Sequence, residues 1–216
     1  MSAAPALLDP PVRDAASFAA RTGATPAQLA DLERFQVRLA DWNTRINLVS
    51  EASLAEFWPR HAFDSAQLPP LAPAARTWVD IGAGAGFPGL VLAILLKQTP
   101  GARVHLVESV AKRSAFLAEV VGALDLPAQV HNARAEALSL TADVVTARAV
   151  APLTKLLGYA QPFLARGAVG LFLKGQGAAA EIAEARKLWR FTCNTLPSLS
   201  DPSGRILRVE GLARVR

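Results

Sequence analysis

Cysteine and long apolar runs are nearly absent from this sequence. Its 216 residues include one cysteine, Cys193, which excludes a disulfide framework and any metal site built from several thiolates. The longest tight apolar run, at residues 89–96, is far shorter than the ~20 residues that a membrane helix needs. The first residues lack the basic and apolar stretches of a secretory signal. We therefore expect a soluble, cytoplasmic protein that uses neither a membrane nor a metal.

Charged residues are also scarce, and their distribution is uneven. Only 19% of the residues are charged and 51% are hydrophobic, which argues against disorder and fits one α/β domain with a small extra lobe. Residues 1–76 have a net charge of −1, and residues 77–216 have +6. Arg is far commoner than Lys, and its planar guanidinium suits phosphate. This excess of cations is compatible with a polyanionic partner and equally with a solubilising charge.

The N-terminal part of the sequence predicts helices. Thr25 is a suitable N-cap and Pro26 a suitable first residue. Apolar residues then recur at spacings of three and four through residues 29–49, which predicts a helix of about six turns. Ser53 is a candidate cap for another helix, kinked or restarted near Pro59.

A proline-rich stretch at residues 68–73 separates this part from a different pattern. We expect an N-terminal helical region at residues 1–75 and a second domain at residues 76–216. There, short apolar runs alternate with helical segments, which predicts βαβ units and a mostly parallel sheet. Two last strands joined by a turn predict a terminal antiparallel pair, giving a seven-stranded sheet. The expected strands are 77–81, 103–107, 128–131, 143–146, 167–173, 191–196 and 205–209, and the expected helices are 88–97, 112–123, 152–164 and 178–189.

Glycines cluster directly after the first expected strand. Gly82, Gly84 and Gly86 alternate before the next helix, and backbone without Cβ atoms can approach a ligand closely. A dinucleotide-binding loop would have its third glycine at Phe87, and a phosphate-binding loop would continue with Gly-Lys-Ser/Thr, so neither pattern fits. The glycine spacing, preceded by Asp80, resembles the first motif of class I S-adenosylmethionine-dependent methyltransferases.

Polar residues follow three other strands of the expected sheet, at the ends where ligands bind. Glu108 ends the second strand, where a carboxylate can accept hydrogen bonds from ribose hydroxyls, although exposed acids also occur at such ends. Ala135 and Glu136 follow the third strand, where they would either border an adenine or begin a helix. Arg148 ends the fourth strand, where the reacting methyl group is expected. Its role is either at the methyl site or in structural pairing with a carboxylate.

The residues after the fourth strand limit which atoms could be the methyl acceptor. Residues 147–152 lack the Asp/Asn-Pro-Pro-aromatic motif common in methylation of amino nitrogens. Methylation of pyrimidine C5 needs a cysteine nucleophile, and Cys193 lies on the last hairpin, where a buried structural thiol is expected. Guanine N7 has a free lone pair and no proton, so its methylation needs alignment and charge stabilisation but no general base. We accordingly expect no catalytic acid or base.

Several segments, in order, resemble one family: the bacterial 16S rRNA guanine-N7 methyltransferase G family, also called the glucose-inhibited division protein B family. The segment with Gly-Phe-Pro-Gly and the Arg-His…Asp-Ser segment are the most selective. Residue 108 is Glu where many members have Asp, and residues 1–24 match nothing recognisable. The matching segments are 41–48, 60–65, 79–90, 108–109 with 112–113, 147–149 and 173–176.

The resemblance implies a fold, a reaction and individual contacts. The fold is the Rossmann-like class I methyltransferase fold, the cofactor is S-adenosylmethionine, and the target is N7 of guanine 527 in the 16S rRNA of the small ribosomal subunit. We expect a monomer. The implied cofactor contacts are Gly82, Gly84, Gly86, Phe87, Glu108, Ala135, Glu136 and Arg148. The implied RNA contacts at the mouth of the site are Arg60, His61, Asp64, Ser65 and Lys174.

Simpler roles remain open for some of these residues. His61 and Asp64 could form a structural ion-paired cluster, and Lys174 could be an ordinary exposed lysine. We assign no chemistry to His105 or His131, and the helical spacing of Trp42 favours packing over base stacking.

Three other functions remain open at this point. A methyltransferase of the same fold could act on a small molecule or a protein, with weak salt dependence of substrate binding. An oxidoreductase could hold a nicotinamide dinucleotide, although Phe87 argues against it. A non-catalytic RNA-binding or cell-division protein could have kept the fold, and it would bind no cofactor.

Overall fold

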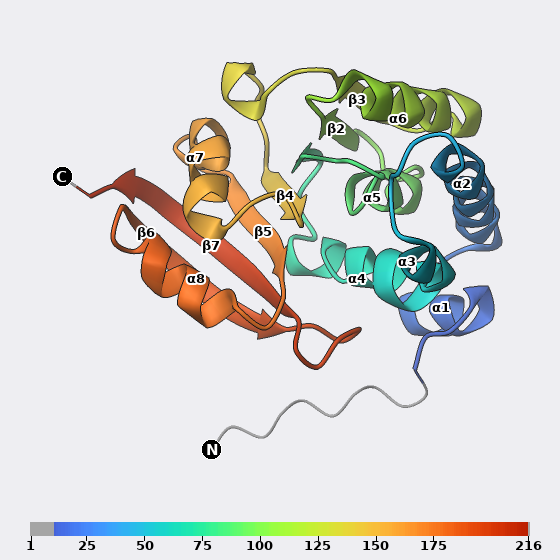
Figure 1. Cartoon of the computed structure of the whole chain (residues 1–216), viewed down its shortest axis with the longest axis horizontal. Helices are drawn as coiled ribbons and strands as arrows, with labels where there is room; N and C mark the ends of the chain where they lie inside the picture. The colour runs from blue at the N-terminus through green and yellow to red at the C-terminus, as the bar shows by residue number, and fades with distance from the viewer. Residues whose placement is uncertain (1–10, 216) are drawn as a thin grey trace.

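A seven-stranded sheet forms the centre of the computed structural model, which describes residues 11–215 (Figure 1). The strand order is β3-β2-β1-β4-β5-β7-β6. β1 to β5 are parallel, and β7 is antiparallel to both of its neighbours, β5 and β6. The prediction of a mostly parallel sheet with a terminal antiparallel pair is confirmed. The strands are β1 (Thr77–Ile81), β2 (Arg103–Val107), β3 (Ala128–His131), β4 (Val144–Arg148), β5 (Val169–Lys174), β6 (Trp189–Pro197) and β7 (Arg205–Arg214).

Helices cover both faces of this sheet, because its central strands are apolar on both sides. In β1, Trp78 belongs to one core and the adjacent Val79 to the other. The first core lies under α1 to α6, and the second lies under α7 and α8. The helical segments are α1 (Ala15–Thr22), α2 (Pro26–Asn43), α3 (Glu51–Ala55), η1 (Phe57–Ala62), α4 (Phe63–Ala66), η2 (Pro69–Leu71), α5 (Gly89–Leu95), α6 (Ala111–Leu124), η3 (Ala135–Ala137), α7 (Leu153–Leu164) and α8 (Ala178–Ala185).

The predicted start of α2 is confirmed, but its predicted length is wrong. Thr25 and Gln28 form a capping box, in which each side chain accepts a hydrogen bond from the backbone N–H of the other. The helix ends at Asn43 instead of continuing to Val49. The Oδ1 atom of Asn43 accepts hydrogen bonds from the backbone N–H groups of Leu48 and Val49, which satisfies these groups in a loop instead of a helix.

The helix that follows begins at a different cap from the predicted one. Ser50, not Ser53, is the N-cap of α3, and its side chain accepts a hydrogen bond from the backbone N–H of Ser53. The expected interruption near Pro59 is present, because this residue lies within the π-helix η1 between α3 and α4. Single π-turns are rare and occur frequently at functional sites.

The N-terminal helices share their core with the sheet. The ring of Phe35 in α2 lies 5.6 Å from Phe57 of η1, 6.4 Å from Phe116 of α6 and 5.3 Å from Phe87 after β1. Trp42 packs on Phe116 and its Nε1–H donates to Glu119, which confirms a packing role. The division of the chain at residue 75 stays a prediction, while the packing joins both parts in one core.

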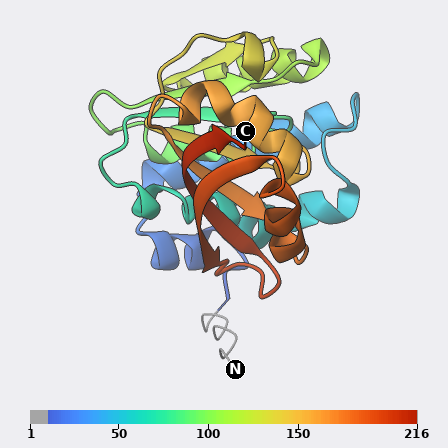
Figure 2. The ribbon, with the colours of Figure 1, turned by 90° about the vertical axis from the view of Figure 1, so that its left-hand side faces the viewer.

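The C-terminal strands are longer than predicted and the helix before them is shorter. α8 ends at Ala185, and Trp189 begins β6, where it is buried and pairs with Arg214 of β7. The pair continues past the predicted ends and contains a register shift near residues 190–192. Figure 2 shows this strand pair at the edge of the sheet that faces the viewer. None of the described helices is both long and apolar enough to cross a membrane.

Candidate active site

A cavity of about 1120 Å³ lies at the carboxyl ends of the parallel strands. Its walls come from α3, η1 and α4, the loop after β1, the ends of β4 and β5, and the turn between β6 and β7. The predicted site residues in its lining are Gly82, Gly84, Phe87, Arg148, Arg60, His61, Asp64 and Lys174. The predicted site residues outside this lining are Gly86, Glu108, Ala135, Glu136 and Ser65.

The glycine loop forms one wall of the cavity with its backbone. Gly82, Gly84 and Gly86 have φ angles of +67°, +53° and +91°, which favour glycine. A Cβ atom on Gly82 would lie 2.6 Å from the Val150 side chain, and one on Gly86 would overlap Leu90. A Cβ atom on Gly84 would meet only the Gly82 carbonyl oxygen, at 3.6 Å. All three backbone conformations favour glycine, but the fold leaves no room for a side chain at 82 and 86, whereas at 84 it leaves space that a ligand can use.

Asp80 lies beneath the glycine loop and joins it to the sheet. Its side chain is fully buried, and its two oxygens accept hydrogen bonds from the Gly89 backbone N–H at 3.0 Å and the Thr146 hydroxyl at 2.9 Å. Burial raises the pKa of Asp80 to about 7. These contacts tie the start of α5 to β4, so Asp80 supports the loop without lining the cavity.

Glu108 holds the glycine loop from the neighbouring strand end. Its Oε2 atom accepts a hydrogen bond from the Gly84 N–H at 3.0 Å, and its Oε1 atom accepts one from the Val110 N–H at 2.8 Å. The side chain is buried, and each carboxylate oxygen keeps a further lone pair. The open space at Gly84 and the free lone pairs of the adjacent Glu108 carboxylate suit an S-adenosyl group, which has a ribose with two hydroxyls. The ribose contact itself stays a prediction.

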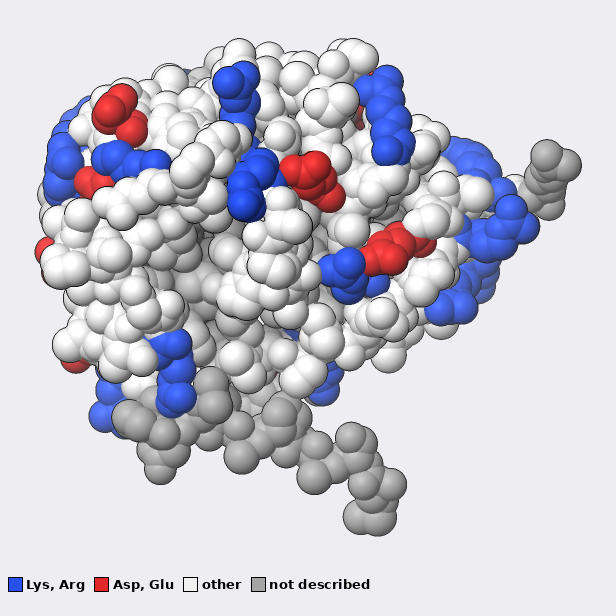
Figure 3. Space-filling model, turned by 180° about the vertical axis from the view of Figure 1, so that it is seen from behind, with Lys and Arg blue, Asp and Glu red and all other residues white. Residues whose placement is uncertain are grey.

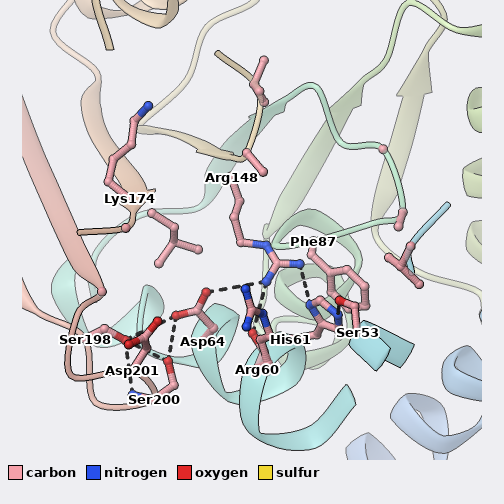
Figure 4. Close-up of a pocket in the computed structure, with 18 of the residues that line it drawn as sticks. Ser53, Arg60, His61, Asp64, Phe87, Arg148, Lys174, Ser198, Ser200 and Asp201 are labelled. Carbon is pink, nitrogen blue, oxygen red and sulfur yellow. Dashed lines mark hydrogen bonds and ion pairs between the residues drawn. The ribbon is translucent and has the colours of Figure 1, made fainter. Parts of the chain in front are cut away.

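The opposite wall is a cluster of side chains around Arg148 (Figure 4). Its Nη2 donates to Nδ1 of His61 at 2.6 Å, and its Nη1 donates to the Arg60 carbonyl oxygen at 3.1 Å. The Asp64 carboxylate lies 3.7 Å from Nη1, and the Arg148 guanidinium lies 5.0 Å from the centre of the Phe87 ring. These contacts join β4, η1, α4 and the glycine loop at one point.

Burial changes the acid–base behaviour of this cluster. It raises the pKa of Asp64, an effect opposed by the charge of Arg148, and it lowers the pKa of Arg148 itself. Burial, and then the charge of Arg148, lower the pKa of His61 to about 3. His61 is therefore neutral near pH 7, while Arg148 and Asp64 form a shielded ion pair. His61 and Asp64 thus belong to a structural cluster that also lines the cavity.

Two predicted RNA contacts have structural partners. Ser65 is fully buried and its hydroxyl donates to the His61 carbonyl oxygen at 2.7 Å. The Lys174 amino group donates to the Ala151 carbonyl oxygen and to Glu181, both at 2.7 Å. In Figure 4 this amino group points away from Arg148. Lys174 is thus no ordinary exposed lysine, because it fixes the segment after β4; an RNA contact by either residue stays a prediction.

The remaining sequence predictions concern residues near β3. Ala135 is buried and Glu136 is exposed in η3, and their place beside an adenine stays a prediction. His105 and His131 lie outside the cavity lining, with Nδ1 of the first 3.0 Å from Nε2 of the second. Burial lowers the pKa of both histidines. The two histidines therefore have each other as hydrogen-bond partners.

Sequence reasoning missed several residues of the cavity. Ser200 and Ser198 of the β6–β7 turn lie near Asp64, whose Oδ1 atom accepts from their hydroxyls at 2.9 and 3.4 Å. The serine-rich turn was visible in the sequence, but its distance from residue 64 hid the contact. Ala149, beside Arg148, has a φ angle of +55°, a strained conformation that clusters at functional sites and that its residue type does not reveal.

Comparison with known proteins identifies relatives over almost the whole chain. The family model described as rRNA small subunit methyltransferase G (GidB) matches residues 28–203. A Caulobacter vibrioides protein named ribosomal RNA small subunit methyltransferase G is 60% identical over 211 residues, which are 98% of each chain. A protein of the same name from Parvibaculum lavamentivorans is 48% identical over 94% of this chain and 92% of its own.

Solved structures agree in fold. A cofactor-bound Mycobacterium tuberculosis protein, Rv0187, has a TM-score of 0.56 and 19% identity, over 94% of this chain and all of that one. An O-methyltransferase from Bacillus cereus, in complex with S-adenosylhomocysteine, has a TM-score of 0.56 and 16% identity, over 84% and 91% of the two chains. The predicted class I methyltransferase fold is confirmed. The match of family and fold also confirms the predicted enzyme class and cofactor, and the chain belongs to the rRNA small subunit methyltransferase G family.

Proposed function

We propose that this protein transfers a methyl group from S-adenosylmethionine to N7 of a guanine in 16S rRNA, namely guanine 527, acting as a monomer in the cytoplasm. The near full-length relatives are named for small-subunit rRNA methylation. The observation that carries the proposal is the joining, in one cavity, of the open glycine loop and the Arg148–Asp64 pair.

The glycine loop and its neighbours are suited to hold the cofactor. Gly82 and Gly84 offer close backbone approach, and the Phe87 ring lies 5.0 Å from the Arg148 guanidinium. Glu108 offers acceptor lone pairs for ribose hydroxyls, and the segment at Ala135 would border the adenine. When bound, S-adenosylmethionine supplies an electrophilic methyl group on a positively charged sulfur.

Guanine N7 suits a site without a general base. The N7 lone pair would take up the methyl group that S-adenosylmethionine supplies, and the electrons of the broken carbon–sulfur bond would stay on sulfur. No proton would have to leave the base and the net charge of the cavity would not change, so the residues of this chain would only need to orient the guanine and stabilise its charge. Arg148 donates through Nη1 and Nη2 to protein acceptors and keeps further N–H groups, which can donate to guanine O6. The carboxylate of Asp64, whose side chain is 17% exposed, balances positive charge nearby.

The surface has the excess of cations that an RNA substrate requires. The formal net charge is +5, and on the face in Figure 3 basic side chains are widespread and gather beside the C-terminal end. Arg60 is exposed at the cavity, and Arg113 and Arg205 also line it. Phosphate contacts of this kind make affinity fall steeply with salt.

A methyl-transfer assay tests the proposal directly. The protein is incubated with labelled S-adenosylmethionine and either small ribosomal subunits or naked 16S rRNA, at several salt concentrations. We expect N7-methylguanosine at one position, with RNA binding weakened by salt. A folded protein that binds the cofactor but methylates neither RNA would contradict the proposal, and salt-independent methylation of a small molecule would favour the alternative substrate class.

A further inference from the structure

His61 has hydrogen-bond partners on both sides of its ring. Its Nδ1 atom lies 2.6 Å from Nη2 of Arg148, and its Nε2 atom lies 2.7 Å from the hydroxyl oxygen of Ser53 in α3. The residue is only 3% exposed. Both ring nitrogens are therefore engaged within the protein, which is not the arrangement expected of a side chain that reads an RNA base.

The identity of the partners fixes the direction of both hydrogen bonds. A guanidinium has only donors, so Nδ1 of His61 must accept from Arg148. A neutral imidazole carries one N–H, which must then be on Nε2 and donate to Ser53. The geometry thus defines one tautomer of His61, with the proton on Nε2.

The surroundings of the ring hold it in this state. The His61 ring is stacked on Phe87, with centroids 4.4 Å apart and an interplanar angle of 13°. Burial and the charge of Arg148 lower the pKa of His61 to about 3, so the ring is neutral near pH 7. Protonation of Nδ1 would remove the acceptor and place a second cation against Arg148.

We propose that Ser53 and His61 are positioning residues for Arg148. Ser53 accepts the Nε2–H of His61, which keeps the Nδ1 lone pair directed at Arg148. The guanidinium is then held by His61, by the Arg60 carbonyl oxygen and by Asp64, and its remaining N–H groups are left for the substrate. The inference rests on the proposed function for the place of Arg148 beside the methyl acceptor, whereas the tautomer can be tested without a substrate.

Nitrogen-15 NMR of the free protein tests the hydrogen bonds. We expect His61 to be protonated on Nε2 and unprotonated on Nδ1 between pH 6 and 8, and the Nη groups of Arg148 to give separate resonances. His61→Phe keeps a stacked ring without an acceptor, so the Nη2 resonance of Arg148 should shift and its protons should exchange faster with water, while Nη1 keeps its other partners. His131→Phe, outside the cavity, is the matched control and should leave the Nη2 resonance as in the wild type. A proton on Nδ1, or a wild-type Nη2 resonance in His61→Phe, would overturn the proposal.

Kinetics test whether the positioning matters for methyl transfer. Ser53→Ala and His61→Phe should each lower kcat by about five- to tenfold, the effect of one hydrogen bond to a charged network, with the KM for S-adenosylmethionine unchanged. Ser53→Thr keeps the hydroxyl, and the amide oxygen of His61→Asn can replace Nδ1, so both should retain most of kcat. Wild-type kcat in Ser53→Ala and His61→Phe, or no recovery in folded His61→Asn, would overturn the proposal. Failure of the wild type to methylate rRNA would instead reject the proposed function and leave the NMR result intact.

Discussion

The two walls of the cavity are built in opposite ways. The wall at the glycine loop consists of backbone, and its shape depends on the lack of side chains at Gly82, Gly84 and Gly86. The wall around Arg148 consists of side chains from separate elements that touch one another. Adding a side chain to the first wall should therefore weaken cofactor binding, and removing a side chain from the second wall should slow methyl transfer.

Removal of Arg148 should have the largest effect. In Arg148→Ala, Asp64 loses its cation and His61 loses its donor, so methyl transfer should fall by about a hundred- to a thousandfold, as for other preorganised donors. The measurement is kcat/KM with rRNA as substrate. Arg166→Ala is a suitable control because Arg166 lies outside the cavity lining, where it donates to the Leu140 carbonyl oxygen. Equal activities of the two variants would show that the side-chain wall is not part of the active site.

Addition of a side chain at Gly84 should have the next largest effect. Gly84→Val should raise the Kd of S-adenosylmethionine about ten- to hundredfold by overpacking. Gly101→Val is the matched control: Gly101 has a φ angle of +74° and open space around it, away from the cavity. Both variants should lose about 1–2 kcal/mol of stability because of the left-handed backbone. Calorimetric titration should separate them, and wild-type affinity in Gly84→Val would mean that the cofactor does not approach this backbone.

Glu108→Gln should have a smaller effect on the same wall. The amide keeps one acceptor but loses a charge-assisted hydrogen bond, so we expect about a tenfold rise in the Kd of the cofactor. Glu119→Gln is the control, since Glu119 is exposed, lies outside the cavity lining and accepts from Trp42. If both variants bind the cofactor as the wild type does, Glu108 supports the loop without contributing to binding.

Asp80→Asn changes neither wall directly, and its effect should be seen as a change in the pH dependence of stability. The pKa of Asp80 is about 7 in the folded protein, against an ordinary value of 3.8 for an aspartate side chain. Between these values the folded state binds more protons than the unfolded state, so this group makes the free energy of unfolding fall as pH rises from about 4 to about 7. Asn does not titrate, so the free energy of unfolding of Asp80→Asn, measured in urea, should rise relative to that of the wild type as pH increases from about 4 to about 7. A constant difference would show that Asp80 does not titrate there.

The sequence predicted the backbone wall far better than the side-chain wall. The glycine spacing and the place of Glu108 directly after β2 are local features, and their positions in a parallel sheet follow from general rules. The contacts of His61 with Ser53 and Arg148 depend on how α3 and η1 pack against β4, which no local pattern specifies. The prediction of a helix through residue 49 was wrong for a different reason. One side chain, Asn43, accepts hydrogen bonds from two backbone N–H groups that a longer helix would have used.

Mapping of modified nucleotides in 16S rRNA tests the central claim most directly. Cells that lack this protein would be supplied with the wild type or with Arg148→Ala, and their rRNA compared by mass spectrometry. We predict one N7-methylguanosine with the wild type that is lost with Arg148→Ala. The same modification in cells with neither protein, or its full presence with Arg148→Ala, would contradict the account.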